Sequence, residues 1–520
     1  MLDNTFWAEK PEKVRKGVAL IDGVLHISEE LKGNREMVNL VAELRRYGIV
    51  DFEFHKPSDF DEHYARFSTR CVSNGNEIQV MATSLIERAY KNDSTDIHLT
   101  DLGNYLRVQF RTLGMLCEHT QMEGETGRWL LQCIYNNLCD STDSESFSNL
   151  KQHDGRITNR DLLPLGMHSV RVHAEPEDQV ASASGTGTFM TLRLLYDSTA
   201  ATGTLEQRMT VMGFLHVHIE TTYSLTQRDG MVVISGPTGH GKTTFLNHVV
   251  TSMTIESPER AYVAVEDPPE YPMRDVHRLK VVTNEALGNS RARGDAYINK
   301  IAGAMRCDTD VLIIGEIRYP AAALSAMDAA MSGHPTWTTI HANNAFGVIP
   351  RMEGMLRQEN IRDPLNALCN PNVLSGLTYQ RLIAKLCPKC KRLYGSLSEE
   401  RRKEAIPKNI LESLKHVLDW EEIMSKVFVR GEGCEHCKKM GLSGQTVVAE
   451  VVELDMEMLS LLRDGKMYEA HKIWHDKGNP TYIEHAIELL RQGIIDPVTA
   501  RIRLGVPLNY NKWFEPGPVR

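Results

Sequence analysis

The chain has 520 residues, of which 42% are hydrophobic and 24% charged, and its formal net charge is −9 at pH 7; these proportions indicate packed soluble domains rather than a disordered or fibrous chain. The acidic balance argues against nucleic-acid binding, which favours basic proteins. No apolar stretch approaches the ~18 residues needed to span a bilayer, and the amino terminus lacks the apolar core of a signal peptide, so we expect a cytoplasmic protein that reaches a membrane only through partners.

The amino-terminal part of the chain predicts two small domains. Residues 1–75 carry no recognisable chemistry, and we interpret them as a partner-docking domain; a helix is expected where Val38, Val41, Leu44 and Ile49 suggest an apolar face. Residues 76–196 combine an amphipathic helix with alternating strand patterns, which predicts a second, α+β domain. The small and polar residues of 197–204 predict a linker and a hinge.

The next segment, residues 205–385, predicts an α/β domain. Short apolar runs such as MVVIS, YVAV, VLII and TWTTI alternate with helical patterns, which is typical of a parallel sheet with crossover helices. Order is expected to break up around two cysteine pairs in residues 386–440. Residues 441–520 form a C-terminal region in which helical periodicity returns.

A phosphate-binding loop follows the first strand of the α/β domain. The pattern GxxxxGK[ST] is complete, and an apolar run precedes it while a helical pattern with Leu246, Val249, Val250 and Met253 on one face follows it. Backbone N–H groups and the helix dipole would hold phosphate oxygens, Lys242 would neutralise the β and γ phosphates, and the Thr243 hydroxyl would bind Mg²⁺. The predicted ATP-binding residues are Gly236, Pro237, Thr238, Gly239, His240, Gly241, Lys242, Thr243 and Thr244.

Acidic residues and a histidine follow later strands of the same domain. The strand-like run from Ala261 to Val265 leads into the acidic EDPPE segment of residues 266–270, the run VLII leads to Glu316, and TWTTI leads to His341. Parallel strands present their carboxyl ends at one edge of a sheet, where ligands bind. Because hydrolysis needs one acid near Mg²⁺ and another near the attacking water, these residues predict an ATPase rather than a passive nucleotide-binding module.

Four of the ten cysteines fall in two CxxC pairs, CPKC and CEHC. Four thiolates from two such turns make a closed tetrahedral Zn²⁺ site, which has no open position for catalysis. The alternative is four reduced and unconnected thiols. The predicted zinc ligands are Cys387, Cys390, Cys434 and Cys437.

Over about residues 80–505 the sequence resembles the secretion ATPases of type II secretion and type IV pilus systems. GPTGHGKTT looks like their Walker A loop, EDPPEY like their acidic box, RCDTDVLIIGEIR like their Walker B segment and SGHPTWTTIHANNA like their histidine box. The resemblance continues upstream in DSTDIHL and YLRVQFRTLG and downstream in YQRLIAKLCPKC and GLSGQTVVAEVVELD. It implies a RecA-like phosphate-loop ATPase domain preceded by a PAS-like α+β domain, with a zinc-binding insertion and a helical C-terminal region.

The resemblance also implies roles for individual residues. Glu270 would be the general base for water, Glu316 the Walker B acid and His341 the histidine-box residue. Arg171 and Arg193 would reach the bound phosphates, where guanidinium groups offset developing charge, and Arg107 and Arg111 are weaker candidates. The chain departs from the family at Arg318-Tyr319-Pro320 and at Leu113, which weakens any statement about contacts between domains.

Finally, the resemblance implies a homo-hexameric motor that acts on an inner-membrane platform protein and other pilus or secretion components. Its four cysteines favour assembly over pilus retraction, because retraction motors of the family generally lack them. The IHANNA segment and the divergent first 75 residues look most like the type IVb branch, which includes thin conjugative and bundle-forming pilus ATPases. The alternatives are a type II secretion ATPase, a retraction or type IV secretion ATPase and, from another class, a nucleic-acid translocase.

Overall fold

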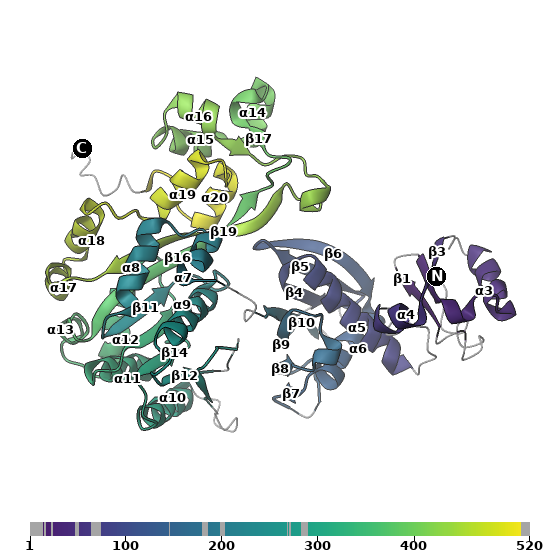
Figure 1. The fold of residues 1–520 in the computed structure, drawn as a ribbon, viewed down its shortest axis with the longest axis horizontal. Coiled ribbons are helices and arrows are strands. Elements are labelled where there is room, and N and C mark those ends of the chain that lie inside the picture. Colours follow the sequence, from purple (N-terminus) through teal and green to yellow (C-terminus); the bar gives the residue numbers. More distant parts are fainter. Residues whose placement is uncertain are drawn as a thin grey trace. The chain divides into compact units, whose positions relative to one another are not determined.

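The computed structural model describes residues 14, 17–21, 24–46, 51–63, 74–144, 146–178, 186–197, 203–267, 269, 272–281 and 290–510 (Figure 1). The chain forms two compact units: residues 1–112 with 116–194, and residues 113–115 with 195–520. Among the described helices none is long and apolar enough to cross a membrane.

The first unit begins with a three-stranded sheet made of β1 (Val18–Ile21), β2 (Val24–Ser28) and β3 (Asp51–His55), in which β1 and β2 are antiparallel and β2 and β3 parallel. The same part of the chain forms the helices α3 (Arg35–Arg46) and α4 (Pro57–His63). The predicted helix is present, and Leu44 is buried and Val41 packs against the core as predicted. Val38 was wrongly placed on that face, because it is 62% exposed, and Met37 and Leu40 are buried in its stead. The i, i+3, i+7 spacing of the buried residues defines the true face. Ile49 lies outside the described residues.

The larger sheet of the first unit has the order β6-β5-β4-β10-β9-β8-β7, and α5 (Asn74–Lys91) and α6 (Gly124–Cys133) pack on one face. The polar and apolar alternation of YLRVQFRT puts Leu106, Val108 and Phe110 on that face. The strands are β4 (Ser94–Asp101), β5 (Tyr105–Thr112), β6 (Met115–Glu123), β7 (Ser141–Thr142), β8 (His153–Ile157), β9 (Met167–Asp178) and β10 (Thr186–Tyr196).

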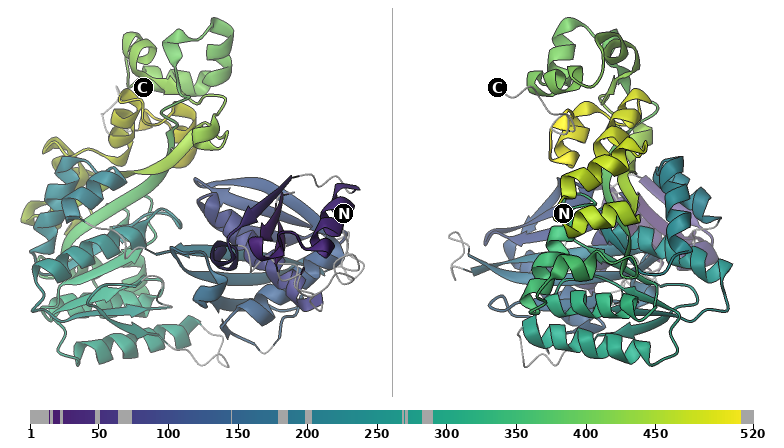
Figure 2. Two further views of the ribbon diagram at one scale, coloured as in Figure 1. Left: turned by 45° about the vertical axis from the view of Figure 1, so that its right-hand side comes forward. Right: turned by 90° about the vertical axis from the view of Figure 1, so that its left-hand side faces the viewer.

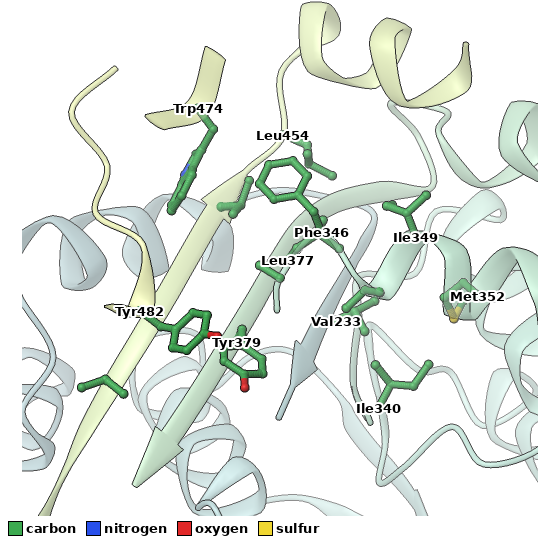
Figure 3. Close-up of a cluster of buried hydrophobic side chains, with 14 of the residues drawn as sticks. Val233, Ile340, Phe346, Ile349, Met352, Leu377, Tyr379, Leu454, Trp474 and Tyr482 are labelled. Atoms are coloured by element: carbon green, nitrogen blue, oxygen red, sulfur yellow. The ribbon is translucent and has the colours of Figure 1, made fainter. Parts of the chain in front are cut away.

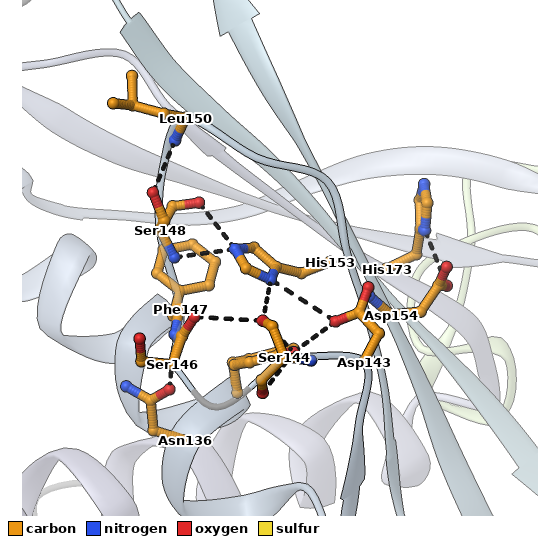
Figure 4. Close-up of polar contacts among 11 residues, drawn as sticks. Asn136, Asp143, Ser144, Ser146, Phe147, Ser148, Leu150, His153, Asp154 and His173 are labelled. Atoms are coloured by element: carbon orange, nitrogen blue, oxygen red, sulfur yellow. Dashed lines mark hydrogen bonds and ion pairs between the residues drawn. The ribbon is translucent and has the colours of Figure 1, made fainter. Parts of the chain in front are cut away.

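A buried polar network fastens the loop between β7 and β8 (Figure 4). His153, 1% exposed, places Nδ1 3.0 Å from Ser144 Oγ and Nε2 2.9 Å from both the amide nitrogen and the carbonyl oxygen of Ser148. The Tyr135 hydroxyl donates to Asp143 Oδ1 at 2.5 Å. Serine and carboxylate approach the same ring nitrogen, so this serine–histidine–aspartate group lacks the relay order of a hydrolase and serves to hold the loop.

The second unit is built on a sheet of order β13-β12-β14-β15-β11-β16-β19. All neighbouring pairs are parallel except β16 with β19, so the predicted parallel α/β sheet is confirmed. The strands are β11 (Met231–Ser235), β12 (Tyr262–Glu266), β13 (His277–Lys280), β14 (Val311–Ile314), β15 (Thr336–Ile340), β16 (Leu374–Leu386) and β19 (Leu442–Glu453).

Helices cover both faces of this sheet. On one face Val232 and Ile234 pack with α7 (Leu205–Met212), α8 (His216–Thr226) and α9 (Lys242–Glu256). On the other, Val233 joins a core that includes Ile340, Met352 and Tyr379 (Figure 3). That face is covered by α10 (Ser290–Met305), α11 (Pro320–Met331), α12 (Val348–Gln358), α13 (Pro364–Leu368), α17 (Met456–Arg463), α18 (Met467–Asp476), α19 (Tyr482–Arg491) and α20 (Pro497–Leu504).

The antiparallel pair β16–β19 extends beyond the parallel sheet and ends at the cysteine pairs, as Figure 2 shows for these long strands. The segment between the pairs was expected to lack order, but it folds. It forms β17 (Arg392–Leu393), β18 (Phe428–Val429), α14 (Glu399–Ala405), α15 (Lys408–Lys415) and α16 (Trp420–Lys426). These helices have at most eight residues, so their periodicity is hard to recognise among the many charged side chains.

Candidate active site

The phosphate-binding loop connects β11 to α9 as the sequence predicts. Every residue of β11 is buried, and Leu246, Val249, Val250 and Met253 anchor α9 in the core. Three glycines of the loop have a positive φ, among them Gly239 at 74°. Gly236 has a φ of 148°, and an added Cβ would lie 2.4 Å from the carbonyl oxygen of Gln380; Gly241, at the helix N-cap, has a φ of 78°. The loop therefore presents the α9 amino terminus with Lys242 as its first residue.

Lys242 lies inside this loop and is 8% exposed. Its Nζ donates to the carbonyl oxygens of Gly236 at 2.9 Å and of Pro237 at 3.1 Å, and lies 3.4 Å from His341 Nδ1. The ammonium group is therefore held above the loop backbone, where phosphate oxygens bind in loops of this kind. Thr243, the next residue, is half-buried at the helix start.

Glu316 lies two residues after the end of β14, and His341 lies one residue after the end of β15. Their side chains meet at the same edge of the sheet. His341 Nε2 lies 2.7 Å from Glu316 Oε1, and Arg318 Nε donates to Glu316 Oε2 at 2.6 Å. Burial favours the protonated carboxyl group, but the hydrogen bond from His341 and the charge of Arg318 outweigh burial and hold the pKa of Glu316 at about 2. Lys242, His341 and Glu316 thus form a connected chain of polar groups, with the carboxylate ionised at neutral pH.

The acidic box is positioned differently from the prediction. The strand runs from Tyr262 to Glu266, one residue later than expected, so Glu266 is part of β12 and 4% exposed. Its Oε2 accepts from Arg278 Nε at 2.8 Å, which makes it a buried ion pair. Glu270, predicted as the general base, lies outside the described residues.

Three residues outside the predicted set hold the loop from the side of β16 and α20. Gln380 Nε2 donates to the His240 carbonyl at 2.8 Å, the Leu382 amide donates to His240 Nδ1 at 2.8 Å, and Arg503 Nη2 lies 3.4 Å from His240 Nε2. Burial, with the nearby charges of Arg503, Arg381 and Lys242, lowers the pKa of His240 to about 3. The neutral ring that accepts the Leu382 hydrogen bond is therefore favoured.

The predicted arginines lie in the first unit. Arg171 on β9 and Arg193 on β10 alternate with buried apolar residues, so they lie on the sheet face opposite α5 and α6. Arg193 Nε donates to Asp96 Oδ1 at 3.0 Å, and Arg111 Nε lies 3.8 Å from Asp96 Oδ2. One face of this sheet therefore carries a group of guanidinium side chains.

The four predicted zinc ligands converge. Cys387 Sγ lies 3.7 Å from Cys434 Sγ, Cys390 Sγ 3.8 Å from Cys437 Sγ, and Cys434 Sγ 3.7 Å from Cys437 Sγ. Tetrahedral zinc with Zn–S bonds of about 2.3 Å requires sulfur separations of about 3.8 Å. The amides of Cys434 and Gly441 donate to Cys437 Sγ, which stabilises a thiolate. The four side chains fit a structural zinc ion.

A buried carboxyl group supports the histidine-box loop, and the sequence did not single it out. Glu450 on β19 is 1% exposed; its Oε2 accepts from the Ala345 amide at 2.9 Å and its Oε1 from the Tyr482 amide at 3.3 Å. Ala345 lies four residues after His341, and Tyr482 begins α19. Burial raises the pKa of Glu450 to about 7, opposed by these two N–H groups.

Because the folded-state pKa of Glu450 exceeds its ordinary 4.5, its ionisation opposes folding. Its contribution is favourable below pH 4.5, is lost as pH rises towards 7 and is constant above that. Glu450→Gln cannot titrate, so the loss of unfolding free energy of about 3 kcal/mol that the wild type shows between pH 4.5 and pH 8 should be absent in this variant. Because the Gln amide has one acceptor oxygen for two backbone N–H groups, the variant also carries a cost that does not depend on pH. Thermal unfolding monitored across this range measures the effect. Glu457→Gln, an exposed carboxyl group on α17, is the control, and a parallel response in both variants would refute the assignment.

The comparisons with known proteins agree with this geometry. The family described as "Type II/IV secretion system protein" matches residues 73–502. The type II secretion system ATPase E of Vibrio cholerae is 25% identical over 80% of this chain and 73% of its own length. The type IV pilus assembly ATPase TfpB of Acinetobacter baylyi is also 25% identical, over 75% of this chain and 59% of its own length. The structure of the Legionella pneumophila ATPase DotB matches 82% of this chain and 96% of that protein with a TM-score of 0.52 at 15% identity, a likeness of fold alone.

Proposed function

The chain belongs to the type II/IV secretion system protein family and is an ATPase, and we propose that it is the motor for assembly of a type IV pilus, of the type IVb branch. The four-cysteine cluster at the end of β16–β19 supports an assembly or secretion motor. In the family that the sequence resembles, such a cluster accompanies assembly and secretion motors rather than retraction motors. The IHANNA segment and the divergent first 75 residues, which look most like the type IVb branch, favour a pilus. We propose that the cluster holds Zn²⁺ and that the chain works as a homo-hexamer on the cytoplasmic side of the inner membrane, through a platform protein.

The proposed reaction uses the connected polar groups of the second unit. ATP would bind with its β and γ phosphates at Lys242 and the α9 amino terminus, and Mg²⁺ would be held by Thr243. The ionised Glu316, fixed by Arg318 and His341, would organise the magnesium shell. Glu270 would accept the proton of the attacking water, and His341, close to both Lys242 and Glu316, would report the state of the γ phosphate.

Arg171 and Arg193, which belong to the first unit, would also contact the phosphates of ATP. Their sheet face carries several guanidinium groups, which offset negative charge that develops on phosphate oxygens. ATP binding would draw the two units together about the segment 197–204, and hydrolysis would release them. If so, substituting either arginine should lower turnover more than ATP affinity; an unchanged turnover number would remove that arginine from the mechanism.

A second candidate function is the energising of type II secretion, because the V. cholerae relative bears that name. Both functions share every nucleotide-binding motif and the cysteine cluster. Pilus retraction and type IV secretion fit less well, because the cluster is not expected in them. The acidic net charge of −9 argues against a nucleic-acid translocase.

A deletion of the gene in its native bacterium should separate these functions. Under the proposal, the deletion strain loses surface pili seen by electron microscopy but still releases its exported enzymes into the medium. The wild-type gene should restore the pili, and the Lys242→Ala form should not. Pili that persist while secretion stops would identify the type II function and reject pilus assembly. Strains with unchanged pili and unchanged secretion would reject both.

A further inference from the structure

The small sheet at the start of the first unit carries a cluster of three metal-ligating side chains. His26 lies on β2, and Glu53 and His55 lie on β3. Within the part of the chain that the structure describes, this is the second group, besides the four cysteines, whose ligand atoms all lie within 4.8 Å of one another. The phosphate-loop chemistry does not use it. We propose that His26, Glu53 and His55 bind a divalent transition-metal ion of the Zn²⁺ type.

The strand register brings the three residues together. In the parallel pair β2–β3, His26 is opposite Glu53, and Ser28 is opposite His55. Residues two apart on a strand share a face, so Glu53 and His55 lie on the same side of the sheet as His26. The alternate residues Leu25 and Ile27 point into the core with α3. The cluster therefore lies on the face of the sheet opposite the apolar core.

The two imidazole rings are hydrogen-bonded to each other, and the separations of the three ligand atoms also match a single shared ion. His26 Nδ1 lies 3.0 Å from His55 Nε2, and Glu53 Oε2 lies 3.6 Å from the first nitrogen and 3.7 Å from the second. At 3.6 Å or more the carboxylate is hydrogen-bonded to neither ring. The circle through these three atoms has a radius of about 2.0 Å, which matches the about 2.0–2.2 Å of Zn–N and Zn–O bonds. An ion almost in that plane would contact all three atoms.

Burial and charge also favour a metal. The side chains of His26 and His55 are 13% and 18% exposed, and that of Glu53 is 61% exposed. Imidazole nitrogens and a carboxylate oxygen are ligand types that Zn²⁺ accepts. The carboxylate supplies one negative charge, and its exposure leaves a fourth position for water.

A metal at this place would join β2 to β3, strands that are separated in sequence by η1 (Glu29–Leu31) and α3. The whole element from β1 to α4 runs only from residue 18 to residue 63. Sheets of this size bury little apolar area and are commonly supported by a metal or by cross-links. The ion would therefore stabilise the pairing of β2 with β3 in this register, because metal-binding free energy adds to folding free energy.

The test is metal uptake by the full-length protein. The reduced chain is stripped with a chelator, titrated with ZnCl₂ alone, desalted and measured for zinc per chain. We expect His55→Gln and His26→Gln each to take up one equivalent less than the wild type. Asp51→Asn removes a carboxylate two residues before Glu53 on β3, and this variant should take up as much zinc as the wild type. A Cys387→Ser chain should lose a different equivalent, so that its combination with His55→Gln loses both.

The comparison of His55→Gln with wild type decides the proposal whatever the state of the cysteine site. Equal zinc uptake by these two chains would overturn it, as would equal loss in Asp51→Asn, which would indicate non-specific surface binding. Far-UV circular dichroism and ATP turnover show whether a variant is folded. If His55→Gln is misfolded, Glu53→Gln replaces it, with an expected fall in zinc affinity at this site of at least about tenfold; unchanged affinity in that variant overturns the proposal.

Discussion

Replacing Lys242 with alanine is expected to lower the rate of ATP hydrolysis by a factor on the order of 10³ or more. The Lys242 ammonium group lies 2.9 Å and 3.1 Å from two loop carbonyls and is the cation nearest the position of the γ phosphate in a loop of this kind. Alanine keeps the start of α9 but removes the charge that offsets the negative charge of the phosphates. Phosphate release at saturating ATP and Mg²⁺ measures the loss.

Two further variants sharpen this experiment. Lys408→Ala removes an exposed lysine on α15 of the same unit and should leave turnover unchanged. Glu316→Gln should retain ATP binding, measured with a fluorescent analogue, while turnover falls, because the amide lacks the charge that the carboxylate carries at neutral pH. Full turnover in the Lys242→Ala chain would refute the assignment of the active site.

The second large effect is expected at the cysteine cluster. If the cluster holds zinc as proposed, Cys387→Ser should take up no zinc there and should open the insertion between residues 388 and 441 to proteolysis. Structural zinc sites contribute about 10–16 kcal/mol of apparent binding free energy, and folding of the surrounding element depends on it. Besides the cysteines, the insertion is held by short helices, a two-stranded sheet of four residues and buried apolar side chains such as Leu414 and Ile423. Zinc content per chain and the pattern of limited proteolysis provide the two measurements.

The matched control is Cys307→Ser. Cys307 is exposed in the same unit and donates weakly to the Gly303 carbonyl, a contact that serine keeps. This variant should retain zinc and resist proteolysis like the wild type. If both Cys387→Ser and Cys434→Ser also kept a full equivalent at the cluster, the four thiolates would not be a zinc site.

The phosphate loop and its polar neighbours could be predicted because their positions follow from local rules. Strand, glycine-rich turn and helix are contiguous at residues 231–256, and the carboxyl ends of parallel strands share one edge. That rule alone brings Glu316 and His341 to the loop, and the structure confirms that they meet. The roles assigned to the site residues stay predictions: those of Lys242, Thr243, Glu316 and His341 as well as those of Glu270, Arg171 and Arg193.

The residues that sequence reasoning missed depend on register between distant segments. Gln380 and Arg503 reach His240 from strand and helix more than a hundred residues away. Glu450 resembles any other polar residue in a strand until its burial against Ala345 is known. The YQRLI and AEVVELD segments contributed to the resemblance, but nothing in their composition indicates which neighbour each side chain contacts.

The amino-terminal sheet shows the same limit on a smaller scale. The separation of His26 from His55 in sequence is 29 residues, and only the parallel pairing of β2 with β3 brings their rings together. The α3 helix was predicted from an amphipathic pattern that includes Val38, Val41 and Leu44, but a helix of twelve residues with apolar side chains on several faces permits more than one choice of buried face. Burial of Met37 rather than Val38 decided between these faces.

The continuity of β16 has a mechanical consequence. The strand contacts the phosphate loop at Gln380 and Leu382 and ends at Leu386, next to Cys387, the first cysteine of the cluster. The distance from Leu382 to Leu386 along the strand is about 13 Å, and the hydrogen bonds to β19 stiffen it. A displacement of His240 would break these hydrogen bonds, bend the β16–β19 pair or shift the end of the pair that carries the cysteine insertion.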